Sequence, residues 1–399
     1  MKHAPQRKIT STQNRNVQPQ NPQPQKPVIQ KNNEDFLTKL KFCTRIFDFK
    51  NEQKDQQEKT LRVQYLTEFS KLLGNQKNVH SLIMPNLTQV FQMIEANIFR
   101  PLPIIKKAGP SEDMQGFEEE LALDQSWPHL QPVYEFFLQL IVNDIADVRS
   151  LKYHISGPFV QSLLALFDSE DNVERDYLKN ILHRVYAKLV PRRKMIRKAV
   201  TDTFYTLIHE IWKFNGAAEL LDIFASIISG FAVPLRDEHV FFFKTVIIPL
   251  HKVQSCQKFH NELLRCSMLF VSKDPSLAFD LILGLLQYWP FASFAKETLF
   301  LSELLEVMDV CDITKLDPHI DILFKRLVRC IASPHLQVSD RSMCFFENDF
   351  FLSVLRNYKL KIFPLMVPII AKLVESHWHK LLQDSFGAIK NILVDIDEN

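Results

Sequence analysis

An apolar stripe with helical spacing recurs along this chain, and that repetition restricts its fold more than any other feature. Three successive sets of apolar residues, within 159–167, 177–189 and 196–211, follow the i, i+3, i+4, i+7 pattern of an amphipathic helix. Short polar or glycine-containing breakers at 168–171 and 215–216 separate the sets. From residue 34 onward the sequence therefore predicts a series of helices.

The helices are expected in pairs that return at a regular interval. The second helix of successive pairs is predicted near Leu182, Ile223, Arg265, Leu304, Cys344 and Phe386. These positions lie about forty residues apart, which is typical of HEAT and armadillo repeats. Because one pair cannot bury its own apolar face, neighbouring pairs must stack. The predicted fold is all-α: an α-solenoid of about eight HEAT-like helix-pair repeats that binds other proteins along a curved surface.

Glycine is scarce, with 8 residues in a chain of 399. Loops that cradle phosphate groups need glycine, because the backbone must approach the ligand closely and adopt positive φ. The glycines are scattered singly, so neither a GxGxxG loop nor a Walker loop can form. This argues against a doubly wound nucleotide-binding fold and favours long helices joined by short turns.

Two segments differ from the helical pattern. Residues 1–33 are rich in Gln, Asn and Pro, and such a composition predicts a disordered tail ahead of the solenoid at 34–399. Residues 100–128 contain prolines, glycines and the acidic run Glu118, Glu119 and Glu120, and are predicted to form an inserted acidic loop. This loop is either a solvated, mobile segment or an acidic arm for a basic partner.

Charge and cysteine content narrow the class of protein. Residues 1–33 hold six Lys and Arg and no acidic residue, so the remainder carries 42 basic against 46 acidic residues. This balance argues against a general nucleic-acid binder. None of the six cysteines forms a CxxC pair, which is typical of free thiols in a reducing compartment. Without an apolar run long enough to span a bilayer, and without a signal peptide, the chain is expected in the cytoplasm, the nucleus or both.

No arrangement of side chains predicts catalysis, a cofactor or a metal. His209 and Glu210 begin a near match to HExxH, but Lys213 occupies the second ligand position. Glu303 and Glu306 have i, i+3 helical spacing and are predicted to be an ordinary solvated pair. The sequence therefore predicts a protein that is not an enzyme.

One group of residues does predict a binding site. Ile223 and Ile227 share a helix face and, with Tyr186, are expected to form an apolar patch on the concave side. The rim of this patch is expected to comprise His183, Arg184, Arg193, Arg236 and His239. Such a groove suits an extended peptide with apolar anchors and acidic or phosphorylated side chains, which arginine can bind in bidentate fashion.

Simpler interpretations of the same residues remain open. Ile223 and Ile227 can instead belong to the core, with the nearby cations merely solvated. The basic run at 192–198 can be a solvated turn, a nuclear-import signal or a phosphate-binding patch.

Several longer stretches carry a resemblance to a known family. They are residues 126–130 (SWPHL), 166–171 (LFDSED), 182–186 (LHRVY), 230–235 (GFAVPL), 249–253 (PLHKV) and 288–290 (YWP). In these stretches the chain resembles the B-prime (B56-type) regulatory subunits of protein phosphatase 2A, and the similarity runs from about Phe36 to about Leu393. It departs from the family at Arg236, where the family carries Lys, and at Phe346, where the family carries Trp. Residues 1–33 have no counterpart.

The resemblance implies a non-catalytic regulatory subunit with eight HEAT-like repeats. It implies assembly with a scaffold subunit and a catalytic serine/threonine phosphatase subunit, and recruitment of substrate proteins that carry a Leu-x-x-Ile-x-Glu peptide, often phosphorylated. The peptide pocket of the family coincides with the eight residues of the predicted groove. The alternative is a solenoid adaptor that binds short linear motifs without any phosphatase.

Overall fold

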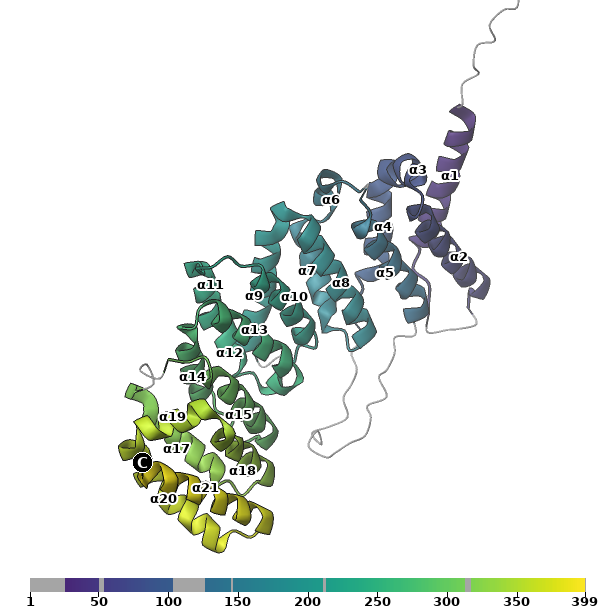
Figure 1. Cartoon of the computed structure of the whole chain (residues 1–399). Coiled ribbons are helices and arrows are strands. Elements are labelled where there is room, and N and C mark those ends of the chain that lie inside the picture. The colour runs from purple at the N-terminus through teal and green to yellow at the C-terminus, as the bar shows by residue number, and fades with distance from the viewer. Residues whose placement is uncertain are drawn as a thin grey trace, which may run out of the picture.

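The computed structural model describes residues 26–49, 54–102, 126–144, 146–210, 213–312 and 317–398, and within these ranges every regular element is a helix. The helices stack pair after pair into an elongated array, with α1 at one end and α20 and α21 at the other (Figure 1). This confirms the predicted all-α solenoid. None of the described helices has the length and apolar character that crossing a membrane requires.

The array has two layers of helices. One layer contains α4 (Leu87–Ile98), α7 (Gly157–Ala165), α9 (Arg193–His209), α11 (Asp237–Phe242), α12 (Ile248–Leu250), α14 (Leu277–Gln287), α17 (Ile320–Ile331) and α20 (Lys359–Ser376). The other contains α2 (Gln56–Leu73), α5 (Trp127–Val142), α8 (Asn172–Lys188), α10 (Ala217–Ser229), α13 (His260–Lys273), α15 (Phe294–Met308), α18 (Leu336–Met343) and α21 (Lys380–Glu398). Helices of one layer pack on their counterparts in the next pair, as α5 does on α8 and α8 on α10.

The remaining elements complete the described chain. They are α1 (Lys26–Cys43), α3 (Gln76–Asn78), α6 (Val148–His154), α19 (Asp349–Asn357), two π-helical segments at Val79–Ile83 and Phe243–Ile247, and 3-10 turns at Met84–Asn86, Leu166–Asp168, Val190–Arg192, Gln254–Lys258, Asp317–His319 and Cys344–Glu347. Helix α1 begins at Lys26, eight residues before the expected start of the solenoid at residue 34. Most of the predicted tail, and the acidic run Glu118–Glu120, lie outside the described residues.

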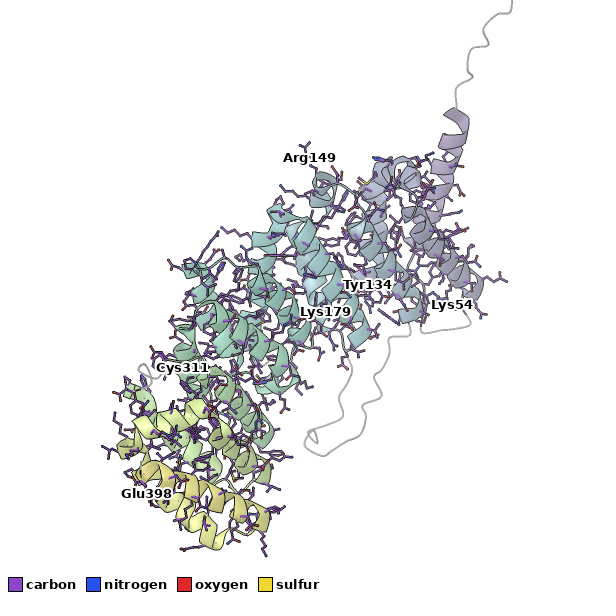
Figure 2. All side chains as sticks on the ribbon, in the orientation of Figure 1. Lys54, Tyr134, Arg149, Lys179, Cys311 and Glu398 are labelled. Carbon is purple, nitrogen blue, oxygen red and sulfur yellow. The ribbon has the colours of Figure 1, made fainter. Side chains whose placement is uncertain are left out.

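Side chains fill the space between the layers along the whole array (Figure 2). Buried apolar residues form one continuous core from Phe36 in α1 to Ile396 in α21. Five of the six positions predicted for second helices fall inside helices of the second layer, and Cys344 directly follows α18. The prediction succeeded because each apolar stripe is a local pattern that the stacking of pairs then buries.

Polar contacts between pairs show the repeat length directly. The hydroxyl of Tyr134 donates to Glu174, 40 residues further on. Arg175 donates to Glu219, 44 residues on, and Arg265 donates to Asp222, 43 residues away. The described chain therefore repeats its contacts at an interval close to the predicted period.

Candidate peptide-binding face

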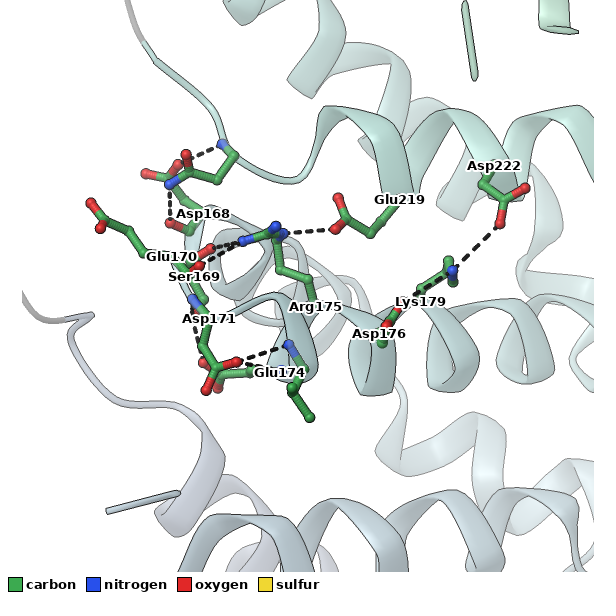
Figure 3. Close-up of polar contacts among 12 residues, drawn as sticks. Asp168, Ser169, Glu170, Asp171, Glu174, Arg175, Asp176, Lys179, Glu219 and Asp222 are labelled. Carbon is green, nitrogen blue, oxygen red and sulfur yellow. Dashed lines mark hydrogen bonds and ion pairs between the residues drawn. The ribbon is translucent and has the colours of Figure 1, made fainter. Parts of the chain in front are cut away.

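A polar network fixes the position of α8, which carries three of the predicted site residues. The side chain of Asp171 caps α8 by accepting from the amides of Val173 and Glu174. Arg175 donates to Glu219 of α10 and to the backbone carbonyls of Ser169 and Glu170 (Figure 3). These contacts hold the start of α8 against α10 and against the turn before α8.

The same network sets the register between α8 and α10. Arg175 lies opposite Glu219, and Lys179 pairs with Asp222 at 3.5 Å (Figure 3). Since both helices run in the same direction, one further turn brings His183 level with residues 226–227. From the sequence we expected His183 beside Ile223. In the structure His183 lies beside residues about one helical turn further along α10.

His183 and Arg184 lie near the end of α8, and both side chains are exposed. Neither makes a hydrogen bond or an ion pair with any residue that the structure describes. Their polar side-chain groups are therefore exposed and not engaged within the part of the chain that the structure describes.

Tyr186 is held by two arginines of the following helix. The Nε of Arg193 donates to the Tyr186 carbonyl at 3.0 Å, and its guanidinium lies 5.2 Å from the centre of the Tyr186 ring. Arg197 donates to the Tyr186 hydroxyl at 3.0 Å. The structure thus brings Tyr186 and Arg193 together, and it adds Arg197, which lies one helical turn after Arg193.

The two isoleucines correct the sequence-based expectation. Ile223 is 3% exposed and Ile227 is 7% exposed, so both belong to the core instead of facing partly outward. Helix α10 lies between α8 and α13, and both neighbours bury its sides. In the structure described, the predicted apolar patch is therefore covered.

Arg236 and His239 lie at the start of α11, where the array turns from α10 into the next pair. The imidazole of His239 stacks on Phe231, with ring centres 3.7 Å apart. Burial lowers the pKa of His239; nearby Arg236 and Arg197 lower it further, while Glu238 opposes them. Arg236 is exposed and lies 3.8 Å from Glu238.

A pocket of about 270 Å³ opens between α9, the end of α10 and α11. Its walls combine aromatic and basic side chains, namely Lys194, Arg197, Lys198, Thr201, Tyr205, Phe224, Phe231, Glu238, His239, Phe241 and Phe242. Of the eight predicted residues only His239 lines it. The basic run at 192–198 indicated the lysines and the arginine of the pocket wall. The phenyl rings could not be predicted in this way, because they come from three elements and have no common sequence pattern.

We call the exposed and half-buried members of this region the cationic face: His183, Arg184, Tyr186, Arg193, Arg197, Arg236 and His239. Within this face, Arg236 and His239 each lie close to the carboxylate of Glu238, at 3.8 and 3.5 Å. Together with the neighbouring pocket the face offers hydrogen-bond donors beside aromatic surface. Such a combination suits an anionic peptide with an apolar anchor.

Glu303 also differs from its predicted environment. It was expected to be solvated with Glu306, but it is fully buried and contacts His251 and His260. Burial disfavours the charged carboxylate and by itself would raise the pKa of Glu303. The two neighbouring imidazoles have a larger, opposite effect and lower this pKa to about 2.

Comparisons with known proteins agree with this architecture. Residues 21–399 match the family described as protein phosphatase 2A regulatory B subunit (B56 family). The chain is 38% identical over 365 residues to the B-prime eta isoform of the 59 kDa regulatory subunit of Arabidopsis thaliana, covering 91% of this chain and 71% of that protein. It is 39% identical over 348 residues to the alpha isoform of the 56 kDa regulatory subunit of Homo sapiens, covering 87% and 70%.

The mouse alpha isoform of the 56 kDa subunit gives a similar result, with 38% identity over 351 residues that cover 88% of this chain and 71% of that protein. The matched regions span nearly all of the described solenoid, including the cationic face. On this evidence the chain belongs to the B56 family of protein phosphatase 2A regulatory subunits, and it is a regulatory subunit and not a catalytic one.

Proposed function

We propose that this chain selects substrates for a protein phosphatase 2A holoenzyme by holding short acidic or phosphorylated peptides on the cationic face. The holoenzyme would consist of this chain, a scaffold subunit and a catalytic serine/threonine phosphatase subunit. The preferred ligand is a peptide of the Leu-x-x-Ile-x-Glu type. Its capture would bring the rest of the substrate within reach of the catalytic subunit.

The observation that carries the proposal is the pocket of about 270 Å³ in which Lys194, Arg197 and Lys198 line the wall together with aromatic rings. An aliphatic side chain buried against the rings of Phe224, Phe231 and Phe242 would contribute about 1.5–3 kcal/mol. Carboxylate or phosphate groups would accept from Arg184 and Arg193, and each charge-assisted hydrogen bond is worth roughly 1.5–3 kcal/mol before exposure reduces it. After ordering costs, an affinity near 1 μM, about −8 kcal/mol, is reasonable.

The burial of Ile223 and Ile227 refines how an apolar anchor would bind. Each is nearly covered, so a peptide would meet at most the edge of these side chains unless neighbouring residues move. The ring-lined pocket next to His239 offers the apolar surface that the two isoleucines were expected to supply.

Removing one exposed cation tests the peptide site. Arg184→Ala and His183→Ala should each weaken binding of a Leu-x-x-Ile-x-Glu peptide at least about tenfold, because each loses a charge-assisted or polar contact of about 1.4 kcal/mol or more. Isothermal titration calorimetry on the folded chain measures the change. Arg329→Ala is the matched control, since Arg329 is exposed on α17, which lies far along the array from α8, α9 and α11 (Figure 1). Unchanged affinity in both variants, with the fold intact, would refute the assignment.

Peptide binding should also depend on pH through His239. Its lowered pKa keeps the free imidazole mostly neutral near pH 7, and an anionic ligand would favour the protonated form. Affinity should therefore rise as pH falls toward about 6, by up to about tenfold per pH unit for one coupled proton. Calorimetry in buffers of different ionisation enthalpy should detect proton uptake in the wild type and less uptake in His239→Asn. Affinity that is flat with pH, with no proton uptake, would exclude this role for His239.

Holoenzyme membership has a separate test. The chain, isolated from its own cells, should bring down a scaffold and a catalytic phosphatase subunit in near-equal amounts. Recovery with peptide-bearing proteins but without any phosphatase subunit would favour the adaptor alternative instead.

A further inference from the structure

Three buried side chains converge at the junction of two helix pairs. His251 lies directly after α12, His260 is the first residue of α13, and Glu303 lies in the middle of α15. Nε2 of His251 is 3.1 Å from both carboxylate oxygens of Glu303, and Nε2 of His260 is 2.9 Å from Oε2. One potential ligand atom from each residue lies within 4.8 Å of the other two. None of the three residues belongs to the cationic face or lines the pocket beside it.

The hydrogen-bond partner of His251 fixes the state of its ring. Nδ1 lies 3.0 Å from the backbone carbonyl oxygen of Ile248, which can only accept, so Nδ1 carries the hydrogen. In the neutral ring Nε2 then has a lone pair that points at the carboxylate of Glu303. Two acceptors facing each other at 3.1 Å require a positive charge between them, either a proton or a metal ion.

His260 distinguishes between these two possibilities. It is 2% exposed, and its Nε2 lies 2.9 Å from Oε2 of Glu303 without the alignment of a hydrogen bond, while its Nδ1 has no partner among the described residues. A buried polar atom without a partner costs roughly 1–3 kcal/mol. A proton shared by His251 and Glu303 leaves Nε2 of His260 beside the carboxylate without a well-aligned partner. A metal ion bound by all three residues accepts the lone pair of His260 Nε2 as well.

The described residues around the cluster do not supply another cation to Glu303. The ammonium group of Lys296 is buried nearby but donates to the carbonyl of Val253 at 2.8 Å. The thiol of Cys256 is buried too, and burial raises its pKa to about 12, so it stays neutral. Phe300 packs against both imidazoles, with ring centres 5.7 Å and 6.3 Å away. A buried carboxylate in such apolar surroundings requires compensation by a positive charge.

We propose that His251, His260 and Glu303 bind one divalent transition-metal ion, with Zn²⁺ the best suited. Two imidazole nitrogens and one carboxylate oxygen are common zinc ligands, at about 2.0–2.2 Å. The bond from His251 Nδ1 to Ile248 is the usual way in which a backbone carbonyl orients a metal-binding imidazole. Any proton held by the imidazoles leaves to solvent as the metal takes their lone pairs. The ion would tie α12, α13 and α15 together and so join the fifth helix pair to the sixth.

Metal analysis of the whole chain tests the site. The chain, produced with an affinity tag that contains no histidine, is unfolded in denaturant with a chelator and refolded with Zn²⁺, with Co²⁺ or with neither. After removal of free metal we expect about one ion per chain by mass spectrometry of the elements, and visible absorption bands of low-symmetry Co²⁺. We also expect a higher unfolding temperature for the Zn²⁺-loaded chain than for the chelated chain.

Variants assign the ion to this cluster. Glu303→Gln and His260→Asn should each lower bound metal to less than about a tenth of an ion per chain, because only two ligands remain. His209→Asn, at an exposed histidine outside the cluster, should keep the full amount. If a cluster variant does not fold, the result for the wild-type chain still decides. If the refolded wild type takes up neither Zn²⁺ nor Co²⁺ in stoichiometric amount, the proposal is overturned and a proton is the shared charge. Retention of the metal by both cluster variants would overturn it as well.

Discussion

Replacing Glu174 with alanine is expected to lower the free energy of unfolding by about 3–5 kcal/mol, because it removes a buried carboxylate that pairs with the guanidinium of Arg100, whose side chain is 17% exposed. Glu174 is 1% exposed and accepts two hydrogen bonds from Arg100, at 2.7 and 3.2 Å. The hydroxyls of Tyr134 and Ser169 each donate to the same carboxylate at 2.6 Å. One substitution therefore removes the shared acceptor of three donors drawn from different parts of the array.

Chemical denaturation followed by circular dichroism measures the effect, and hydrogen exchange should locate the loosened region in α5 and α8. Asp176→Ala is the control on the same helix. Asp176 is 63% exposed and pairs with Lys179, so its loss should change stability by no more than about 1 kcal/mol. Equal stability losses in the two variants would show that the buried carboxylate has no special role.

Gly216→Ala is expected to destabilise the chain by about 1–3 kcal/mol, although it adds a single methyl group. A Cβ at position 216 would lie 2.5 Å from both the Cβ and the carbonyl oxygen of Phe167. Backbone atoms cannot move aside as a flexible side chain does, so the start of α10 must shift away from the turn at Leu166–Asp168. That shift would also stretch the bonds from Asn215 to Asp168.

The same substitution at Gly387 should have the opposite sign. Gly387 lies inside α21, and an added Cβ would meet nothing within 4 Å. Alanine has a higher helix propensity than glycine, so Gly387→Ala should stabilise the chain by about 0.5–1 kcal/mol. The unfolding midpoints of both variants, compared with the wild type, check the pair. A loss of stability at both positions would mean that the close approach to Phe167 does not cause the destabilisation by Gly216→Ala.

The positions of the helices could be predicted from the sequence. The sequence did not always predict whether an apolar residue of a helix faces the core or the groove. Periodicity predicted α8 and α13 well, because each has one apolar face and one polar face. Helix α10 has apolar residues on most of its surface, and its buried set includes Leu220, Ile223 and Phe224. The same i, i+4 spacing then fits a groove-facing pair and a core pair equally well, and Ile223 and Ile227 proved to be core.

The remaining errors come from contacts between distant residues. Glu303 resembles any solvated glutamate in its local sequence, and only the stacking of pairs brings His251 and His260 against it. The wall of the pocket likewise depends on the turn that stacks Phe231 on His239. Local patterns carry no information on such pairings when one sequence is read alone. The exposure of His183 and Arg184 was predictable because the polar face of α8 is clear from its own periodicity.

Contacts between neighbouring pairs join residues that are only about one repeat apart in the sequence, and this affects folding during synthesis. Most bonds between neighbouring pairs, such as those joining Tyr134 to Glu174 and Asp222 to Arg265, close loops of about one repeat. Such loops can form as soon as one further pair has emerged from the ribosome, since domains form from the N-terminal side during synthesis. The third and fourth pairs, with most of the cationic face, can therefore be assembled before α20 and α21 have been translated.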